Sequence, residues 1–362
     1  MWQKSRFFIL FISAIIMLFL FFSCKVSKTN LPEETEIERS DLRIMFYNTE
    51  NYFDIYDDTL KDDDEFLPDN QRNWNSYRFN DKKNKIAKVI TAVGGWQLPD
   101  VVGFCEIENH YVLEQLVSYS ALPQNIYGII HTESPDARGI DVGLIYKKES
   151  LTPLFFQSYR LYIPTVENFA SRDILHAEFL TKQNDTLHIF VNHWPSRRGG
   201  QAASEPRRMA AANLLRQKTD SLFALNNNCN IIILGDFNDA AVDKSITEGL
   251  KAVKPDNEPF NEKLYNLTHF FGNDYVQGSY KYQGNWESID QVIVSGGMLR
   301  GGNGLITGKL SANVFYRDFL LETDDQFTGV KPFRTFAGFN YQNGFSDHLP
   351  VFIDVSFCNK DN

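Results

Sequence analysis

Polar residues stand at the ends of several short apolar runs in this sequence, and their types are those that bind metal ions and move protons. Runs of this length and composition predict buried strands, and strands of one packed sheet can bring their terminal residues to a single edge. The residues concerned are Asn48, Glu106, Asn192, His193, Asp236, Asn238, Asp290, Asp347 and His348. We therefore expect a cluster of carboxylates, amides and two histidines at one edge of a sheet.

The ligand chemistry of this cluster suits a hard divalent cation. Carboxylate and amide oxygens without a thiolate favour Mg²⁺, with Mn²⁺ or Ca²⁺ as alternatives, over zinc, because small hard cations prefer oxygen. Such a cation keeps waters that phosphate oxygens can replace, and it neutralises the charge that develops on phosphorus-bound oxygens. An imidazole can move a proton near neutral pH. The cluster therefore predicts chemistry at a phosphate ester.

Supporting groups for this chemistry can be assigned from residue type. A carboxylate on the second nitrogen of an imidazole fixes its tautomer, and we assign Asp290 to His348 in this role. Glu133 is the corresponding candidate for His193. We assign Arg172, together with Asn192 in the list above, to the phosphate of the substrate, since a planar guanidinium can grip a non-bridging oxygen.

Taken singly, these residues also have structural explanations. Asp236 and the residues after it could form an Asx turn, Glu106 could favour a helix N-terminus, and Asn48 could simply end a strand. A surface ion pair would equally explain Arg172. Only the joint occurrence of the residues favours the catalytic interpretation, because each short motif alone is frequent by chance.

Alternating strands and helices must position these residues. Helical periodicity is present at 84–93, at 110–117 and most clearly at 205–225. No Pro- or Gly-rich linker divides the chain, so we expect one catalytic domain over residues 42–358. Apolar runs predict strands at 42–47, 101–105, 142–146, 187–191, 231–234, 289–294 and 349–355.

The composition limits the classes of partner. The chain has 36 Lys and Arg against 46 Asp and Glu, a formal net charge of −10, which argues against a broad basic surface for nucleic acid. A local basic rim remains possible, and Trp194 and Trp286 could stack on bases. The candidate rim residues are Arg197, Arg198, Arg207 and Arg208. An equally good explanation of these residues is a solvated helix start with ordinary aromatic packing.

The N-terminus predicts export. Lys4 and Arg6 precede an apolar stretch at 7–22 that is shorter than the roughly 20 residues needed to span a bilayer. Ser23 and Cys24 end it in a pattern that resembles a bacterial lipobox, so we expect a lipoprotein-type signal peptide at 1–23 and lipidation of Cys24. Residues 24–41 would form a flexible polar tether. The alternative is an uncleaved short anchor with unmodified Cys24.

Seven segments occur in the order that is typical of a known superfamily. Together they resemble the endonuclease/exonuclease/phosphatase superfamily, which includes deoxyribonucleases, sphingomyelinases and inositol polyphosphate phosphatases. The resemblance implies an α/β fold, a four-layer α/β/β/α sandwich with two packed mixed β-sheets. The matching segments are 46–51, 105–109, 139–144, 191–196, 235–239, 289–292 and 346–350.

The resemblance also implies roles for the cluster. Asn48 and Glu106 would bind the divalent metal, and Asp347 would support the metal or the neighbouring histidine. The resemblance assigns the remaining residues to catalysis without deciding which is the base and which is the acid. They are Asp236 and Asn238 for the attacking water, His348 with Asp290 as an acid/base pair, and His193 with Glu133 as a second pair.

These observations together predict a metal-dependent hydrolase of phosphodiester bonds. We expect an exported endonuclease that acts on DNA or RNA, monomeric and held on the bacterial cell envelope, in the periplasm or at the surface, by its N-terminal lipid. The alternatives are a phosphatase, a sphingomyelinase-like phospholipid phosphodiesterase, and a non-catalytic surface-binding lipoprotein. A binding protein would have no need for a metal site with two histidines, which disfavours the last.

Overall fold

The computed structural model describes residues 41–163, 169–255, 258–272 and 275–358. The predicted signal peptide, Cys24 and the tether up to residue 40 lie outside the described residues. None of the helices within the described ranges combines the length and the apolar character needed to cross a bilayer. The fold therefore concerns the predicted catalytic part of the chain.

The first sheet has seven strands. They are β1 (Leu42–Tyr52), β2 (Val101–Ile107), β3 (Tyr127–His131), β4 (Asp141–Lys147), β14 (Leu305–Ile306), β15 (Ala312–Val314) and β20 (Val351–Phe357). The order is β14, β20, β1, β2, β4, β3, and β15 also pairs with β20. β1 and β2 are parallel, whereas β20 and β4 flank them in antiparallel orientation. This mixed sheet therefore brings the carboxyl ends of β1 and β2 to one edge.

The second sheet also has seven strands. They are β5 (Leu151–Tyr159), β6 (Ile174–Thr181), β7 (Thr186–His193), β8 (Asn230–Asp236), β9 (Ala252–Val253), β10 (Leu264–Asn266) and β13 (Asp290–Ser295). The order is β5, β6, β7, β8, β13, β10, β9. β7 and β8 are parallel and β13 is antiparallel to β8, so the start of β13 lies beside the end of β8.

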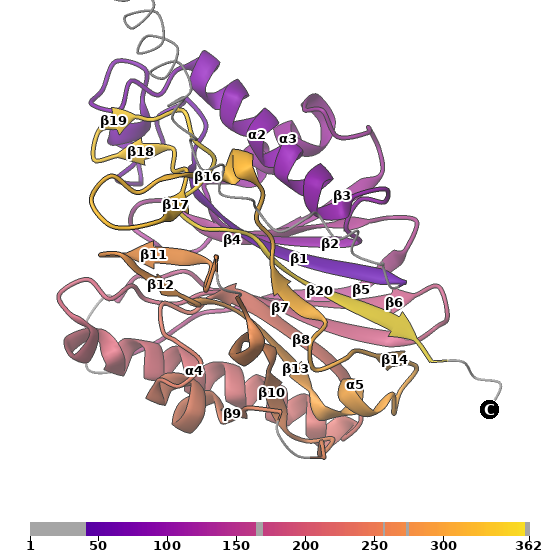
Figure 1. Cartoon of the computed structure of the whole chain (residues 1–362). Helices are drawn as coiled ribbons and strands as arrows, with labels where there is room; N and C mark the ends of the chain where they lie inside the picture. The colour runs from indigo at the N-terminus through magenta and orange to yellow at the C-terminus, as the bar shows by residue number, and fades with distance from the viewer. Residues whose placement is uncertain (1–40, 164–168, 256–257, 273–274, 359–362) are drawn as a thin grey trace, which may run out of the picture. The chain divides into compact units, whose positions relative to one another are not determined.

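The alternation of apolar side chains explains the four layers. In β1, Ile44 and Phe46 pack into the cluster between the two sheets, whereas Met45 and Tyr47 pack with residues of the helices α2 (Ser76–Gly94) and α3 (His110–Tyr119). Successive strand residues point to opposite faces, and both faces of β1 are covered. α2 and α3 therefore lie outside the first sheet (Figure 1).

The second sheet is covered in the same way on its outer face. Ile231 and Ile233 of β8 pack with Ala212 and Leu215 of α4 (Gln201–Leu225), whereas the alternate residues of β8 face the first sheet. Figure 1 shows α4 on the opposite side of the two sheets from α2 and α3. The predicted α/β fold with two packed mixed sheets is confirmed.

Helix starts follow local capping chemistry. The Asn75 side chain accepts hydrogen bonds from the backbone of Tyr77 and Arg78 at the start of α2, and the Asn109 side chain accepts one from Val112 at the start of α3. An asparagine at this position satisfies backbone donors that have no partner within the helix. The remaining helical segments are α5 (Gly296–Arg300), η1 (Asp64–Phe66), η2 (Ser245–Leu250), η3 (Leu267–Phe270) and η4 (Asp318–Leu320).

Three short hairpins complete the fold, and the sequence patterns did not predict them. They are β11 (Tyr280–Tyr282) with β12 (Asn285–Glu287), β16 (Leu321–Thr323) with β17 (Val330–Pro332), and β18 (Phe336–Ala337) with β19 (Asn340–Tyr341). Each predicted strand overlaps an observed one, and each predicted helix lies within α2, α3 or α4. Seven strands of the two large sheets were also not predicted, namely β3, β5, β6, β9, β10, β14 and β15.

Candidate active site

Strand register brings the predicted residues together. His193 at the end of β7 lies opposite Asp236 at the end of β8, and Asp236 lies opposite Asp290 at the start of β13. In the first sheet, Asn48 of β1 lies opposite Cys105, the residue before Glu106. The cluster expected at the strand ends is therefore present, with one half contributed by each sheet.

A hydrogen bond joins the two halves of the cluster. The Asn48 amide donates to Oδ2 of Asp236 over 3.2 Å, and its own oxygen accepts from the backbone of Glu50 at 3.0 Å. Both Asn48 and Asp236 are buried. Buried polar side chains with satisfied partners have few alternative positions, so Asn48 fixes the distance between the two sheets at the site.

Unusual backbone conformations aim the side chains. Glu106 has φ 57°, Glu50 and Asn51 have φ 50° and 60°, and Asn238 has φ 51°. The ladder between β1 and β2 is irregular where Glu106 stands, and the Asn51 backbone donates to Oε2 of Glu106 over 3.0 Å. Left-handed conformations of residues other than glycine cost about 1 kcal/mol or more and persist where the surroundings enforce them. Four of the ten such residues within the described ranges therefore lie at this site.

His348 and Asp290 form a buried pair. Nδ1 of His348 lies 2.7 Å from Oδ2 of Asp290, and the Ser279 hydroxyl donates to the same oxygen at 2.5 Å. The Tyr280 ring stacks on the imidazole with centroids 4.7 Å apart. Burial lowers the pKa of His348, but the adjacent Asp290 carboxylate outweighs it and the pKa is raised well above its ordinary value. The pairing expected for these two residues is present.

His193 has different surroundings. Its Nε2 lies 3.8 Å from Oδ2 of Asp236 and 4.0 Å from Oε1 of Glu106. Its Nδ1 is buried and has no hydrogen-bond partner among the described residues. Burial and the charges of Arg172 and Arg138 hold the pKa of His193 well below its ordinary value. His193 is therefore neutral at neutral pH.

The expected pairing of Glu133 with His193 is wrong. Oε1 of Glu133 lies 3.9 Å from Nδ1 of His131, and the Glu133 side chain is 61% exposed. His131 also contacts Asp141, at 3.1 Å. Glu133 follows β3 at the edge of the first sheet, whereas His193 ends β7 in the second sheet. The carboxylate of Glu133 therefore lies near the imidazole of His131, which is two residues away in the sequence.

The residues predicted to bind phosphate are largely engaged inside the protein. The Asn192 amide donates to the Leu234 carbonyl over 3.1 Å and its oxygen accepts from the Trp194 indole at 3.2 Å, with no exposed area. The predicted phosphate contact of Asn192 is therefore wrong, because neither polar end is available. Arg172 binds Asp136 at 3.2 Å and the Trp194 carbonyl at 2.6 Å, while its Nε has no hydrogen-bond partner among the described residues.

The remaining predicted residues line the same place. Asn238 donates its amide to the Trp194 carbonyl over 3.1 Å, and its backbone N–H donates to Oδ1 of Asp236 at 2.9 Å. Asp347 is 22% exposed at the side chain and accepts from Arg334 over 3.1 Å. The catalytic and metal roles of all these residues stay predictions, because the geometry places them without assigning a role.

The donor set fits a hard divalent cation. Burial, with the nearby charges of Asp290 and Glu106, raises the pKa of Asp236 to about 7, although His348 opposes the shift. Carboxylates crowded in this way repel one another, and a divalent cation would relieve the repulsion. Oxygen ligands predominate, although Cys105 lies within 4.8 Å of the ligating atoms of His193 and Asp236. The buried Cys105 thiol has a pKa raised by burial, so it is a poor metal ligand.

Two of the four arginines expected to form a basic rim are engaged in internal contacts, whereas Arg198 and Arg207 are exposed. Arg197 binds Glu287 and the Asn238 carbonyl, both at 2.6 Å, and buried Arg208 binds Asp239 at 2.7 Å. Trp194 is 1% exposed and cannot stack on a base. The part of the nucleic-acid argument that rested on Arg197, Arg208 and Trp194 is therefore wrong, whereas the part that rested on Arg198 and Arg207 stays a prediction.

Four residues of the site escaped the sequence patterns. Ser279 and Tyr280 support the His348 pair, and Arg138 and Arg334 place positive charge beside the two histidines. Arg138 directly precedes the segment 139–144, which resembles the superfamily, and this position was the one sequence signal that could have indicated it. Tyr280 begins β11, Ser279 precedes it, and Arg334 lies in the short connection between β17 and β18, where the sequence has no periodic pattern.

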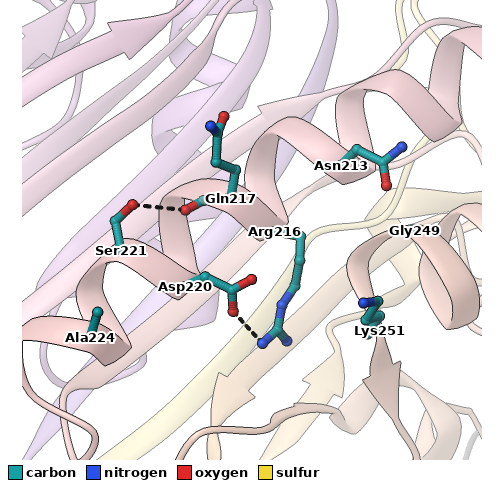
Figure 2. Close-up of a pocket in the computed structure, with 8 residues that line it drawn as sticks. All are labelled: Asn213, Arg216, Gln217, Asp220, Ser221, Ala224, Gly249 and Lys251. Atoms are coloured by element: carbon teal, nitrogen blue, oxygen red, sulfur yellow. Dashed lines mark hydrogen bonds and ion pairs between the residues drawn. The ribbon is translucent and has the colours of Figure 1, made fainter.

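A separate groove lies on the outer side of the second sheet. It has a volume of about 460 Å³ between α4 and η2. Figure 2 shows Arg216 turned toward Asp220, with which it forms an ion pair. The groove is polar, open and contains none of the residues of the candidate active site. Its lining residues are Asn213, Arg216, Gln217, Asp220, Ser221, Ala224, Gly249 and Lys251.

Comparison with known proteins agrees with this architecture. A model of the Endonuclease/Exonuclease/phosphatase family matches residues 43–356. A search of curated proteins finds no match. A Bacteroides thetaiotaomicron protein of that family is 15% identical with a TM-score of 0.54, and the alignment covers 89% of this chain and 100% of that one.

Two further structures are similar in fold. A mannosyl-6-phosphatase of Bacteroides thetaiotaomicron is 17% identical with a TM-score of 0.53, over 87% of this chain and 100% of that one. The human Nocturnin catalytic domain with bound sulfate is 16% identical with a TM-score of 0.50, over 88% of this chain and 94% of that one. At these identities the similarity concerns the fold alone.

Proposed function

This chain belongs to the endonuclease/exonuclease/phosphatase family, and we propose that it is a divalent-metal-dependent phosphodiesterase that cuts nucleic acid within the strand. The family makes it a hydrolase of phosphate esters. The choice of a diester, of nucleic acid and of a metal requirement is our proposal. The observation that carries it is the convergence of two imidazoles on one carboxylate oxygen.

That oxygen is Oδ2 of Asp236. It lies 3.8 Å from Nε2 of His193 and 4.0 Å from Nε2 of His348. The two histidines have opposite protonation at neutral pH, since the pKa of His348 is raised and that of His193 is lowered. Groups whose environments push their pKa values apart are typical of acid/base sites. The arrangement favours hydrolysis over simple binding.

The residues divide the reaction between them. With its pKa raised to about 7 by burial, Asp236 can accept a proton from the attacking water, which the Asn238 amide helps to position. His348 holds a proton on Nε2 and can donate it to the leaving oxygen. The Asp290 carboxylate accepts a hydrogen bond from Nδ1 and stabilises the positive charge of the protonated imidazole. His193 is neutral and can donate a hydrogen bond to a non-bridging oxygen.

The residues that would bind the metal come from the first sheet and from the segment before β20. Glu106 and Asn48 would hold the cation, with Asp347 beside them, and Mg²⁺ is the ion that we propose, with Mn²⁺ or Ca²⁺ as alternatives. A bound cation supplies charge neutralisation at the phosphate oxygens. Glu106 is the best placed of the three, because its carboxylate faces the site while the Asn51 backbone holds its other oxygen.

We also propose that the enzyme is an exported monomer held on the bacterial envelope by lipid on Cys24. The basis is the sequence pattern of residues 1–24. An enzyme placed outside the cytoplasm would meet nucleic acid from the surroundings, which fits a scavenging nuclease better than a chromosomal repair enzyme.

A substrate panel tests the proposal. Plasmid DNA, RNA, sphingomyelin, inositol phosphates, mannose 6-phosphate and bis(p-nitrophenyl) phosphate are each incubated with Mg²⁺, Mn²⁺, Ca²⁺ or chelator. We expect metal-dependent cleavage of nucleic acid and of the small diester. Preference for a monoester would favour a phosphatase, and preference for sphingomyelin a phospholipase. Binding without turnover of any member would contradict an enzymatic role.

A further inference from the structure

Two arginines at the candidate active site have exposed side chains, in contrast to Arg197 and Arg208 of the expected rim, which are engaged in internal contacts. The first is Arg334, whose side chain is 41% exposed. Its Nη2 lies 3.1 Å from Oδ2 of Asp347, and its Nε lies 3.5 Å from Oε1 of Glu50. Two carboxylates therefore lie against a guanidinium whose side chain stays partly exposed.

The carboxylate behind Arg334 is itself rigidly held. Glu50 is buried and accepts backbone hydrogen bonds from Thr335 at 2.5 Å and Phe336 at 3.2 Å. Its backbone has the strained φ of 50° described above. A guanidinium fixed by a rigid carboxylate loses little freedom when it binds an anion, because part of its ordering has already occurred.

The second arginine is Arg138, whose side chain is 49% exposed. Its Nε lies 3.7 Å from Oδ1 of Asp136, and the other oxygen of Asp136 binds Arg172 at 3.2 Å. Arg172 in turn donates to the carbonyl of Trp194, the residue after His193. This chain of contacts links Arg138 to the segment that carries His193, and the charge of Arg138 contributes to the lowered pKa of that imidazole.

The two arginines are linked by contacts to different histidines of the site. Arg138 is connected to His193, which comes from β7 of the second sheet, whereas Arg334 contacts Asp347, the neighbour of His348. Both histidines face Oδ2 of Asp236. Each of the two histidines at this oxygen is therefore linked to a different exposed arginine.

We propose that Arg138 and Arg334 bind the phosphates that precede and follow the scissile one, so that the substrate is the interior of a phosphodiester strand. The inference rests on the proposed phosphodiesterase function and adds to it the groups that recognise the strand. A small diester with a single phosphate has nothing to offer to these positions. The scissile phosphate itself is left to the metal and His193.

The test compares substrates with and without flanking phosphates. Arg334→Gln and Arg138→Gln are measured on a single-stranded DNA oligonucleotide and on bis(p-nitrophenyl) phosphate. We expect the ratio of kcat/KM on the oligonucleotide to that on the small diester to fall roughly tenfold in each variant, as for one lost hydrogen bond to a charged group. Arg334→Lys, which keeps the charge, should recover much of the ratio.

Arg216→Gln is the matched control. It removes one positive charge from an arginine that is also paired with an aspartate, on the outer groove of α4 (Figure 2). It should leave the ratio unchanged. A comparable fall in this control would mean that overall charge, and not the position of the arginines, governs the preference.

Binding to the metal-free protein separates this inference from the proposed function. The dissociation constant of a fluorescent oligonucleotide is measured in chelator against salt concentration, where each lost phosphate contact should lower the slope by about 0.7. Absence of turnover by the wild type with every metal would refute the proposed function, while the slopes still decide the role of the arginines. Unchanged slopes and an unchanged substrate ratio in both variants would overturn the inference.

Discussion

Replacing Asp290 by Asn should sharply reduce turnover with little change in substrate affinity. The carboxylate lies 2.7 Å from Nδ1 of His348, and the two side chains are 1% and 7% exposed. An amide in its place can either offer an oxygen to His348 without the charge, or turn its NH₂ toward a nitrogen that already carries a proton. Both arrangements weaken the hold on the protonated imidazole.

The size of the loss follows from the role of the imidazole. General acid/base catalysis by a positioned side chain contributes a factor of about 10² to 10⁴, so the variant should lose about 3 to 5 kcal/mol of transition-state stabilisation. Burial keeps water from replacing the lost carboxylate, so the upper part of this range is expected. The fall should appear in kcat and not in KM.

The assay is steady-state hydrolysis of bis(p-nitrophenyl) phosphate at saturating Mg²⁺, together with thermal unfolding of both proteins. Asp141→Asn is a matched control, because Asp141 is also buried and contacts a histidine, His131, at 3.1 Å. The control should keep kcat within about threefold, since it leaves the catalytic imidazole intact. A decrease in kcat of less than tenfold in Asp290→Asn, or an equal decrease in kcat in both variants, would refute the reasoning.

Three further predictions concern metal, pH and location. Glu106→Ala should weaken Mg²⁺ binding in calorimetric titration, whereas His348→Ala should bind Mg²⁺ nearly as tightly as the wild type; equal weakening would make His348 a ligand. Burial, and for His176 the charge of its neighbour, lower the pKa of His176 to about 3 and of His188 to about 4, so the contribution of this pair to the free energy of unfolding, present above pH 6.5, should fall by about 2 to 4 kcal/mol at pH 5. Chemical denaturation of the wild type and of a variant without the two histidines, at pH 7 and at pH 5, checks this, and an equal pH dependence of the two proteins would contradict it. Cys24→Ser should release the protein from membranes, and mass spectrometry that finds unmodified Cys24 in the envelope-bound wild type would contradict the lipid anchor.

The convergence of polar strand ends could be predicted because it follows from local patterns. The alternation of apolar residues in β1 marks a strand covered on both faces, and Asn48 follows this alternation where the core ends. The same reasoning applies to Asp236 after β8. The sequence order of the motifs then identified the superfamily, and with it the two packed sheets.

Partners that depend on tertiary contacts could not be predicted. Glu133 was assigned to His193, yet the closer imidazole of His131 captures it, and no local pattern distinguishes two such partners. Arg197 looked like a free basic group because its partner Glu287 is 90 residues away in the sequence. Charge pairing of this kind depends on the folded geometry, and it engages Arg197 and Arg208, two of the four arginines of the expected basic rim.

Irregular segments were missed for a different reason. The edge strand β5 contains Pro153 and exposes most of its side chains, so it lacks the apolar alternation of a half-buried strand. Ser279 precedes a short hairpin and Tyr280 begins it, yet both residues contact the pair of His348 and Asp290. Short elements carry too few residues to produce a periodic signal.

The central claim is that hydrolysis depends on a divalent cation held by this site. The most direct measurement is the turnover of bis(p-nitrophenyl) phosphate by protein freed of metal, before and after stoichiometric addition of Mg²⁺ or Mn²⁺. The account predicts no turnover without metal, recovery on addition in the wild type, and no recovery in Glu106→Ala at the same concentration. Full activity of the metal-free protein in excess chelator would contradict the account.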